Sequence, residues 1–412
     1  MVQKLLLEIS NQLTVDVMDR AFKLKTGSQD WVKHMEVTRA APAGTGLLGA
    51  VFRIKLYGEN HIATFIAKAM VQDRLLRKSL QPEKYFEREV RFFSEVLPML
   101  KEIQKSAGAK ENIQNIVPIC YAYHCDGVND FLLLEDLRER NCVAFSDNPT
   151  KCERDAILTT LAHLHAVSMA LRVKKPIDFA KLANVLHDVY YTDSNRAWYS
   201  VYFQNAIDIC LKTLAEFEDP TTSVYYNKFL KLVSDDPYEL LIKIASNQSI
   251  HPAINHGDAW IPNYLGTGNK AVAIDFQLAR CTSPVTDIMM FLSMNCRELR
   301  NKSDAFDDMK VYHNALAYFL EDMGLNADEV YSWKDLKQDL KVFGKFGILT
   351  SLTSIPLICS TRCDVLGEFE KKYSGLDKIP LEELWELTPF QTIEEKKYLV
   401  KSVRNAVDME LI

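Results

Sequence analysis

The spacing of apolar residues changes near Leu137, and this change constrains the fold more than any other feature of the chain. Before it, short runs such as "AVFRIKLYG" and "HIATFIAKAM" alternate imperfectly between apolar and polar residues, as strands do. After it, apolar residues recur mainly at helical spacing, as in "KCERDAILTTLAHLHAVSMALRV". We therefore expect an α+β protein, with an antiparallel sheet within residues 1–137 and a larger, mainly helical part in residues 138–412.

The first part is expected to follow the order strand, strand, helix, strand, strand after a helical extension over residues 1–30. The two runs quoted above flank the turn "GEN" and predict a hairpin. The segment "PEKYFEREVRFFSEVLPMLKEIQ" predicts a helix that begins near Pro82. The runs "IVPICYAYHC" and "DFLLLEDL" predict two further strands around the turn "DGVN".

Length and composition bound the class of protein. A chain of 412 residues exceeds the usual size of one hydrophobic core, so two packed lobes are expected. The net charge of -6 and the lack of any Lys/Arg-rich run argue against nucleic acid as a partner. Nine scattered cysteines fit reduced thiols in a cytoplasmic protein better than a disulfide framework. The apolar run from Phe346 to Cys359 is broken by Pro356 and too short to span a membrane, so we expect a buried helix.

A glycine-rich segment, "GTGLLG", opens the predicted hairpin with Gly44, Gly46 and Gly49. Its spacing matches a dinucleotide-binding turn, but that motif requires a helix directly after the glycines. Here a strand follows, which fits a glycine-rich hairpin folded over nucleotide phosphates. Taken alone, the segment fits equally well a hairpin loop whose glycines only supply positive φ.

Two charged residues of the same part have the chemistry of a phosphate-binding pair. Lys68 interrupts the apolar strand "TFIAKAM", where an ammonium group is costly to bury unless it meets an anion. Glu89 follows on the predicted helix and would hold the lysine in place, although Glu83, Glu87 and Glu95 compete for that role. Two alternatives remain open at this point: an edge-strand lysine that extends into water, and a solvated glutamate.

The segment "INHGDAWIPNYLG" contains the residues best suited to catalysis. Phosphoryl transfer needs a carboxylate that accepts the proton of the acceptor hydroxyl, and oxygen ligands for Mg²⁺. Asp258, Asn263 five positions on, and then Asp275 in "AVAIDFQLAR" supply one base and two magnesium ligands in the order of a kinase catalytic loop. A polar turn before a strand explains each residue separately but not their order.

Neighbouring residues indicate a small-molecule acceptor rather than a protein. Gly257 stands where protein kinases carry an arginine, and Gln277 stands where they carry a glycine. The stretch between Asp275 and Asp287 is too short for a typical activation segment, on which protein substrates usually dock.

Several segments together resemble the ecdysteroid kinase-like family of insects, which lies within the choline-kinase and aminoglycoside-phosphotransferase branch of the protein-kinase-like fold. These segments are "HGDAWIPN", "IDFQLAR" followed by "SPVTDIMMFL", "FEREVRFFSEVLP", "FLLLEDL" and "LAHLHAVS", and the resemblance covers about residues 30 to 400. It implies a bilobal fold and the ATP- and Mg²⁺-dependent phosphorylation of a hydroxyl group on a steroid-like or other lipophilic small molecule. Choline kinases more often carry Asn where Gly257 stands and Glu where Gln277 stands.

The resemblance also implies roles for individual residues. Asp258 resembles the catalytic base of the family, and Asn263 and Asp275 resemble its magnesium ligands. Lys68 with Glu89 resembles its phosphate-binding pair.

Three further positions carry structural or adenine-binding roles in the family. The backbone from Glu135 to Leu137 resembles the hinge that meets adenine. Asp287 resembles an aspartate that supports the catalytic loop, and His165 is expected to be a packed, hydrogen-bonded core histidine.

Other functions remain open on the sequence alone. They are a choline- or aminoglycoside-type kinase of another small alcohol, a nucleotide- or sterol-binding module without catalysis, and a dinucleotide oxidoreductase that rests on "GTGLLG" alone. The segments 195–203 and 346–359 are apolar enough to wall a lipophilic pocket, but core packing explains both equally well. The sequence indicates neither the acceptor nor the oligomeric state.

Overall fold

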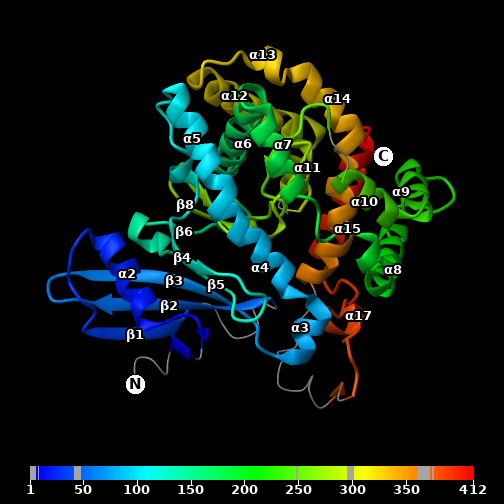
Figure 1. Ribbon diagram of the computed structural model, residues 1–412. Coiled ribbons are helices and arrows are strands. Elements are labelled where there is room, and N and C mark those ends of the chain that lie inside the picture. The colour runs from blue at the N-terminus through cyan, green and yellow to red at the C-terminus, as the bar shows by residue number, and fades with distance from the viewer. Residues whose placement is uncertain are drawn as a thin grey trace. The chain divides into compact units, whose positions relative to one another are not determined.

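The computed structural model describes residues 6–7, 9–40, 48–246, 249–294, 301–359, 372–373 and 375–412. The chain divides into two compact units (Figure 1). Unit 1 consists of Met1–Leu97, Val117–Val143 and Cys363–Ile379, and unit 2 consists of Pro98–Ile116, Ala144–Arg362 and Pro380–Ile412. The expected α+β class is confirmed, whereas the domain boundary near residue 137 stays a prediction.

Unit 1 is built on a five-stranded antiparallel sheet with the order β1-β2-β3-β5-β4 (Figure 1). The hairpin predicted from the sequence is formed by β2 and β3, and Val51 lies opposite Lys68 in it. β3 also pairs with β5, where Leu132 lies opposite Lys68. β3 is therefore a central strand, and the alternative of an edge-strand lysine is wrong. The strands are β1 (His34–Arg39), β2 (Gly49–Tyr57), β3 (Ile62–Met70), β4 (Cys120–His124) and β5 (Phe131–Glu135).

Two elements of unit 1 were not predicted from the sequence. β1 is an edge strand whose apolar alternation consists of Met35 and Val37 alone, and of these only Met35 is fully buried. α3 (Arg74–Leu80) is short, and its formation depends on the hydrogen bonds that cap its two ends. The side chain of Asp73 caps it by accepting a hydrogen bond from the Leu76 N–H at 2.7 Å.

The predicted long helix is present, but a π-helical turn interrupts it. α4 (Pro82–Arg91) leads into the π turn Phe92–Val96, and α5 (Leu97–Ala107) continues from there. The N–H of Leu97 bonds to the carbonyl of Phe92, five residues back. Pro98 follows directly and has no N–H to continue the α-helical ladder, which accounts for the wider turn at this point.

The core of unit 1 lies between its sheet and the helix α2 (Val15–Thr26), which contacts β3 and β4. Thr14 caps α2, and Gly27 ends it in the left-handed conformation. The largest side chains of this core are Phe22, Phe65 and Phe131, each almost fully buried.

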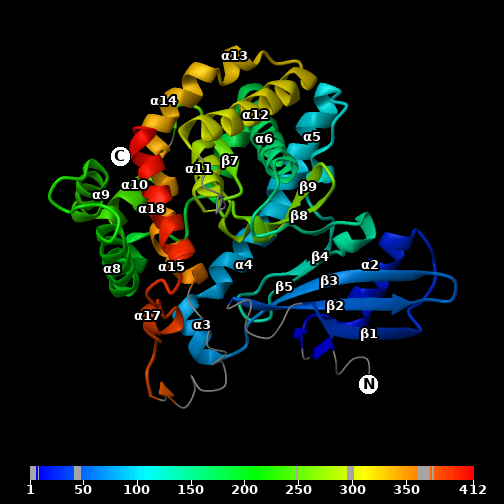
Figure 2. The same ribbon diagram turned by 180° about the vertical axis from the view of Figure 1, so that it is seen from behind.

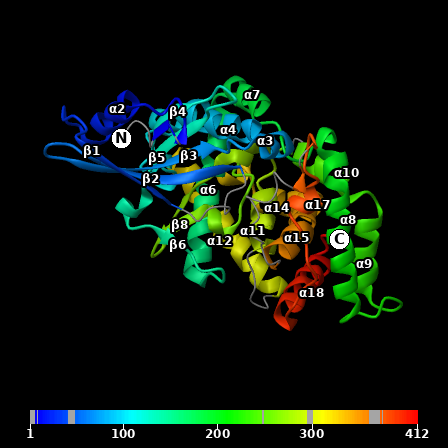
Figure 3. The same ribbon diagram turned by 90° about the horizontal axis from the view of Figure 1, so that it is seen from below.

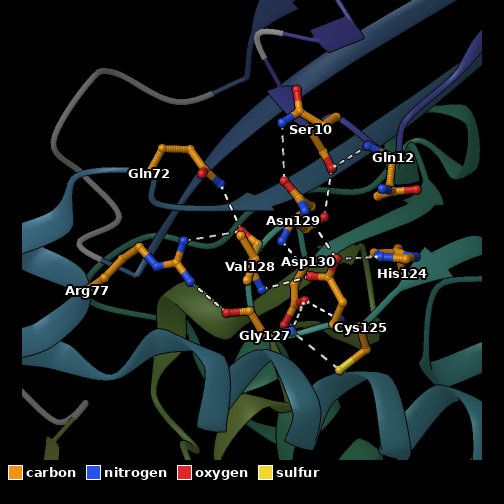
Figure 4. Close-up of polar contacts among 12 residues, drawn as sticks. Ser10, Gln12, Gln72, Arg77, His124, Cys125, Gly127, Val128, Asn129 and Asp130 are labelled. Atoms are coloured by element: carbon orange, nitrogen blue, oxygen red, sulfur yellow. Dashed lines mark hydrogen bonds and ion pairs between the residues drawn. The ribbon is translucent and has the colours of Figure 1, made fainter.

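The predicted turn "DGVN" between β4 and β5 is held by polar contacts from several parts of unit 1 (Figure 4). Asp130 is buried, and its Oδ1 accepts the backbone N–H groups of Asp126 (2.7 Å) and Gly127 (2.8 Å). Burial raises the pKa of the Asp130 carboxyl group, while these two bonds oppose the shift. Arg77 of α3 donates to the Gly127 carbonyl at 2.6 Å, and Ser10 donates to the same turn. These bonds satisfy backbone N–H and C=O groups of the turn, and they fix the register of the strands on either side.

Unit 2 is mainly helical and is built around α6 (Lys151–Lys174), which contacts α7, α12, β7 and β9 (Figure 2). A capping box formed by Thr150 and Glu153 begins α6. The other helices are α7 (Pro176–Val185), α8 (Asp193–Ala215), α9 (Val224–Ser234), α10 (Pro237–Ser246), α11 (Val285–Met294), α12 (Lys302–Asp322), α13 (Ala327–Val330), α14 (Trp333–Phe343), α15 (Lys345–Cys359), α17 (Leu381–Leu384) and α18 (Ile393–Asp408).

Two small sheets accompany these helices and carry the catalytic-loop segment. β7 (Ala253–Asn255) pairs antiparallel with β10 (Arg280–Thr282). β8 (Tyr264–Thr267) and β9 (Lys270–Ala273) form a hairpin that β6 (Val143–Ala144) extends to three strands.

The most apolar helices of unit 2 are core helices. By length and composition α6 would cross a membrane, but 83% of its apolar window is buried inside the protein. The helical stretch Ala327–Phe343, which contains α13 and α14, passes the same test only together with α15, and the two are bent by 49°. The prediction of a buried helix for α15 is confirmed, and the Tyr202 hydroxyl of α8 donates to the Thr353 carbonyl of α15 at 3.2 Å (Figure 3). The two segments considered as pocket walls therefore pack against each other.

The expectation of reduced cysteines is confirmed for the residues that the structure describes. The cysteines in these ranges are free thiols: Cys120, Cys125, Cys142, Cys152, Cys210, Cys281 and Cys359.

His163 on α6 is a buried histidine that is held in its neutral form. The amide of Gln104 donates to His163 Nε2 at 2.9 Å, because the Gln104 oxygen is already bonded to the N–H of Ile113 at 2.6 Å. If Nε2 of His163 were protonated, its N–H would point at the amide N–H of Gln104, so the neutral imidazole with an unprotonated Nε2 is favoured. The imidazole also stacks on Phe319 with 4.0 Å between ring centroids. Burial lowers the pKa of His163 to about 4.

We expect the stability of the protein to fall as the pH is lowered from about 6.5 toward 4. The unfolded chain takes up a proton near pH 6.5 that the folded His163 accepts only near pH 4, and this difference is equivalent to about 3 kcal/mol. His163→Gln keeps a hydrogen-bonding group and should flatten the pH dependence of the thermal unfolding midpoint in this range. Parallel curves for the two proteins would contradict this role.

Candidate active site

The catalytic-loop segment lies between β7 and a 3₁₀ turn, Ile261–Asn263. β7 pairs with β10 so that Asn255 lies opposite Arg280. The Asn255 amide donates to the Thr282 carbonyl at 3.0 Å and to the Ala253 carbonyl at 2.9 Å. The loop therefore starts from a fixed, buried strand, which restrains the residues that follow.

Gly257 is the only residue type that fits its position. Its φ is +86°, a conformation that L side chains rarely adopt. A Cβ atom at this position would lie 1.8 Å from the carbonyl oxygen of Leu278. The loop thus passes so close to the segment after Asp275 that any side chain here is excluded.

A buried carboxylate on α11 holds the loop backbone. Asp287 accepts the backbone N–H groups of His256 at 2.6 Å and Gly257 at 3.0 Å. His165 Nε2 lies 3.2 Å from the same carboxylate, and His165 Nδ1 lies 2.9 Å from the Tyr312 hydroxyl. Burial opposes ionisation, but the bond to His165 and nearby positive charge lower the pKa of Asp287. Both expectations, a loop-supporting Asp287 and a core His165, are confirmed.

Asp258 and Asn263 form one hydrogen-bonded pair. The Asn263 Nδ2 atom donates to Asp258 Oδ2 at 2.8 Å and to the Asp258 carbonyl at 3.0 Å. The nitrogen end of the amide is thereby turned to Asp258, which leaves the oxygen end as the one suited to a cation. The N–H of Ile274 donates to the Asn263 carbonyl at 2.9 Å and so ties the loop to the residue before Asp275.

Asp275 adopts a left-handed conformation with φ +67° and ψ +66°. Such angles are uncommon outside glycine and are often stored at functional sites. β9 ends at Ala273, two residues before Asp275; the backbone reverses at Asp275 and continues through a 3₁₀ turn into β10.

The Asp258 carboxyl group has an altered pKa. Asp258 is partly buried, and burial together with the charge of Asp275 raises its pKa to about 7. The bond from Asn263 and the charge of Arg280 oppose this shift. A carboxyl group that titrates near neutral pH is suited to accept a proton during a reaction.

In unit 1, Lys68 and Glu89 form the predicted ion pair. Lys68 Nζ donates to Glu89 Oε2 at 2.6 Å, and the Glu89 side chain is 1% exposed. The competing residues on the same helix turn outward: Glu87 and Glu95 are about half exposed and pair with Arg91. The choice of Glu89 among these glutamates is therefore supported by geometry, while the phosphate-binding role stays a prediction.

The structure gives less support to a nucleotide-binding role for the three predicted glycines. Gly44 and Gly46 lie outside the described residues. Gly49 begins β2, where a Cβ atom would lie 2.4 Å from the Ala69 carbonyl oxygen, so close packing already requires a glycine.

The predicted adenine hinge is an ordered connection after β5. The Glu135 carboxylate accepts the Ile119 N–H at 3.1 Å and the Arg140 Nε–H at 2.8 Å. Leu137 begins a 3₁₀ turn, and its carbonyl accepts the Cys142 N–H at 3.1 Å. A contact with adenine stays a prediction for Glu135 and Leu137.

Arg280 is a residue of this site that the sequence analysis missed. It begins β10, is 1% exposed, and donates from Nη1 to Asp188 Oδ2 at 3.2 Å. The signal was present in the sequence, because an arginine in the apolar run "AVAIDFQLAR" meets the criterion that singled out Lys68.

Gly257→Ala is expected to destabilise the protein by about 2 kcal/mol or more, because the new Cβ meets the Leu278 carbonyl and the residue has positive φ. Gly268→Ala is a matched control, since its φ is +58° but open space surrounds its Cβ position. It should cost about 1 kcal/mol. Urea unfolding measures both variants, and equal losses would show that the close approach to Leu278 does not matter.

Several solved structures of kinases are similar to this chain at low sequence identity. None of the curated proteins matches the chain. A choline kinase from Cryptosporidium parvum Iowa II is 11% identical with a TM-score of 0.41, over 92% of this chain and 89% of that chain. A Plasmodium vivax ethanolamine kinase is 14% identical with a TM-score of 0.39, over 98% and 92%. An amicoumacin kinase in complex with AMP-PNP and Ca²⁺ is 12% identical with a TM-score of 0.42, over 95% and 94%.

A family model supplies the decisive match. The model described as the ecdysteroid kinase-like family matches residues 43–325, which is more than half of the chain. The chain therefore belongs to the ecdysteroid kinase-like family of small-molecule kinases, enzymes that transfer phosphate to an alcohol group.

Proposed function

We propose that the protein uses ATP and Mg²⁺ to phosphorylate a hydroxyl group of a steroid-like or other lipophilic small molecule. The observation that carries this proposal is the Asp258–Asn263 pair with Asp275 nearby, fixed on a backbone that Asp287 holds. A turn with no chemical task would not need a strained aspartate, a buried carboxylate support and an aspartate that titrates near pH 7.

Asp258 is the proposed catalytic base. The bond from Asn263 occupies Oδ2 and fixes the plane of the carboxylate, so Oδ1 is the atom that takes the proton of the acceptor hydroxyl. As that proton moves to Oδ1, the hydroxyl oxygen becomes the nucleophile for the transferred phosphoryl group. The partial exposure of Asp258 lets an acceptor reach the carboxylate.

Asn263 and Asp275 are the proposed magnesium ligands. An amide oxygen and a carboxylate are the oxygen donors that Mg²⁺ takes from proteins beside nucleotide phosphates. The fit is supported by the repulsion between Asp258 and Asp275, which raises the pKa of Asp258 and which a nearby cation would reduce. When bound, the ion would neutralise charge on the phosphates of ATP.

Lys68 is the proposed ligand of the α- and β-phosphates, held in place by Glu89. The pair lies in the middle of the sheet, where a lysine with no anion would be costly. Gly49 and the backbone of Glu135 and Leu137 complete the proposed nucleotide site.

The lipophilic character of the acceptor is supported by an aromatic cluster in unit 2. Tyr191 makes ring contacts with Phe346, at 5.9 Å between centroids, and with Tyr190 at 4.8 Å. Burial raises the pKa of Tyr191, and the charges of Asp188 and, to a smaller extent, Asp258 add to this shift, so the cluster lies within electrostatic range of the base. A steroid as acceptor is supported by the family description alone. A cytoplasmic location is supported by the free thiols.

Asp258→Asn is expected to lower turnover about 10²–10⁴-fold, because the amide cannot accept the hydroxyl proton. The assay is ADP release from Mg–ATP with a panel of hydroxylated steroids, neutral alcohols and choline. The thermal unfolding midpoint should change little, since Asn keeps the shape of the side chain. Undiminished turnover of an acceptor that the wild type phosphorylates would remove Asp258 from this role.

Glu89→Gln is expected to lower kcat/KM for ATP about 10- to 100-fold, equivalent to about 1.4–2.8 kcal/mol, because Lys68 loses its charged partner. Glu87→Gln on the same helix is the control, since Glu87 is half exposed and pairs with Arg91. It should leave kcat/KM for ATP nearly unchanged. Equal effects of the two substitutions would reject the specific role of the Lys68–Glu89 pair.

A further inference from the structure

Arg280 has a buried edge that no described residue satisfies. The Nε and Nη2 atoms of its guanidinium are buried and have no hydrogen-bond partner within the described ranges. Leaving two N–H groups of a charged side chain buried and unpaired is costly, and native proteins rarely do so without a reason. This edge of Arg280 is therefore suited to bind a hydrogen-bond acceptor that is not part of the described chain.

Two other buried donors lack a partner in the described part of the chain: the indole Nε1 of Trp260, just before the 3₁₀ turn Ile261–Asn263, and the hydroxyl of Tyr264, which begins β8. Both are neutral groups, whereas the guanidinium of Arg280 is charged, so the unpaired edge of Arg280 is the most costly of the three to leave without an acceptor.

The other contacts of the Arg280 guanidinium show which of its edges remains free to bind a ligand. Nη1 is used by Asp188, whose other oxygen accepts the backbone N–H groups of Tyr190 (2.9 Å) and Tyr191 (2.6 Å). The face of the guanidinium lies over the Phe346 ring, with 4.7 Å from Cζ to the ring centroid. What remains is the Nε–Nη2 edge, whose two parallel N–H groups match the two oxygens of a phosphate or carboxylate.

The backbone places Arg280 beside the catalytic loop. Arg280 lies opposite Asn255 in the β7–β10 ladder, three residues before Asp258. Leu278, two residues before Arg280, is in contact with Gly257. The positive charge of Arg280 also acts on the Asp258 carboxylate. Asp258 itself is partly exposed, unlike Arg280.

We propose that the Nε–Nη2 edge of Arg280 binds a two-oxygen anionic group, a phosphate or a carboxylate, on the molecule that meets Asp258. Two sources share this chemistry. One is the phosphoryl group transferred in the reaction and retained in the phosphate ester. The other is a carboxylate carried by the acceptor itself. The choice between these sources rests on the proposed function, whereas the anion site does not.

The binding test uses inorganic phosphate as the probe and needs no knowledge of the acceptor. Phosphate should raise the unfolding temperature of the wild type in a dose-dependent way, with Mg–ADP present to occupy the nucleotide site. Arg280→Lys keeps the charge but loses the paired N–H groups, and should weaken phosphate binding at least about tenfold. Arg196→Lys is the control, because Arg196 is a partly exposed arginine paired with Asp236 and Glu239, and it should respond like the wild type.

A second measurement covers the case in which Arg280→Lys folds poorly. In wild-type protein labelled with ¹⁵N-arginine, phosphate should shift one Nε–H resonance of a slowly exchanging, buried arginine. The same resonance should be absent from the spectrum of Arg280→Lys. The proposal is overturned if the wild type shows no phosphate response, or if Arg280→Lys responds to phosphate like the wild type.

Kinetics with an acceptor found in the ADP-release assay distinguish the two sources. If the transferred phosphoryl group is bound, Arg280→Lys lowers kcat about tenfold or more and leaves the KM of the acceptor unchanged. If the acceptor carries the carboxylate, Arg280→Lys raises the KM of a hydroxylated steroid acid and not that of its methyl ester. The proposed base and the anion site can fail separately. If phosphate binding depends on Arg280 but the Asp258→Asn variant keeps full turnover, the proposed base is rejected and the anion site is retained.

Discussion

The buried carboxylate of Asp287 is the interaction on which the rest of the catalytic loop depends. It accepts the N–H groups of His256 and Gly257 and is itself held by His165. Because this carboxylate has no exposure to solvent, breaking any of these bonds would leave a charge or a donor unsatisfied in the core. The backbone just before Asp258 is therefore fixed from α11, and the orientation of the proposed base follows from helix packing rather than from the loop itself.

The structure changes what Gly257 means. In the sequence, the glycine stood out because protein kinases carry an arginine at that position, and this difference indicated a small-molecule acceptor. The close approach of Leu278 and the positive φ exclude every side chain there, whatever the acceptor. The argument for a small acceptor consequently depends more on the short stretch between Asp275 and Asp287, which α11 and β10 occupy.

Sequence reasoning worked where a single residue conflicted with its own segment. Lys68 in an apolar strand was such a conflict, and Glu89 on the following helix, one of four glutamates considered there, is the partner that resolves it. The edge strand β1 was missed because its apolar alternation extends over only two residues, Met35 and Val37. Arg280 posed the same conflict in "AVAIDFQLAR", but its partners Asp188 and Phe346 lie far away in the chain, so no neighbouring residue in the sequence indicated how the conflict is resolved.

The strained conformation of Asp275 connects the two halves of this site. A strand that continued through "AVAIDFQLAR" would have carried Arg280 away along the direction of β9. The left-handed turn at Asp275 instead sends the chain back, so that β10 pairs with β7 and Arg280 comes to lie opposite Asn255. Such a conformation costs about 1–3 kcal/mol in a residue other than glycine. The ladder between β7 and β10 and the packing of Phe276, which is fully buried, offset that cost. One backbone reversal thus places the proposed metal ligand and brings Arg280 into the strand that pairs with the start of the catalytic loop.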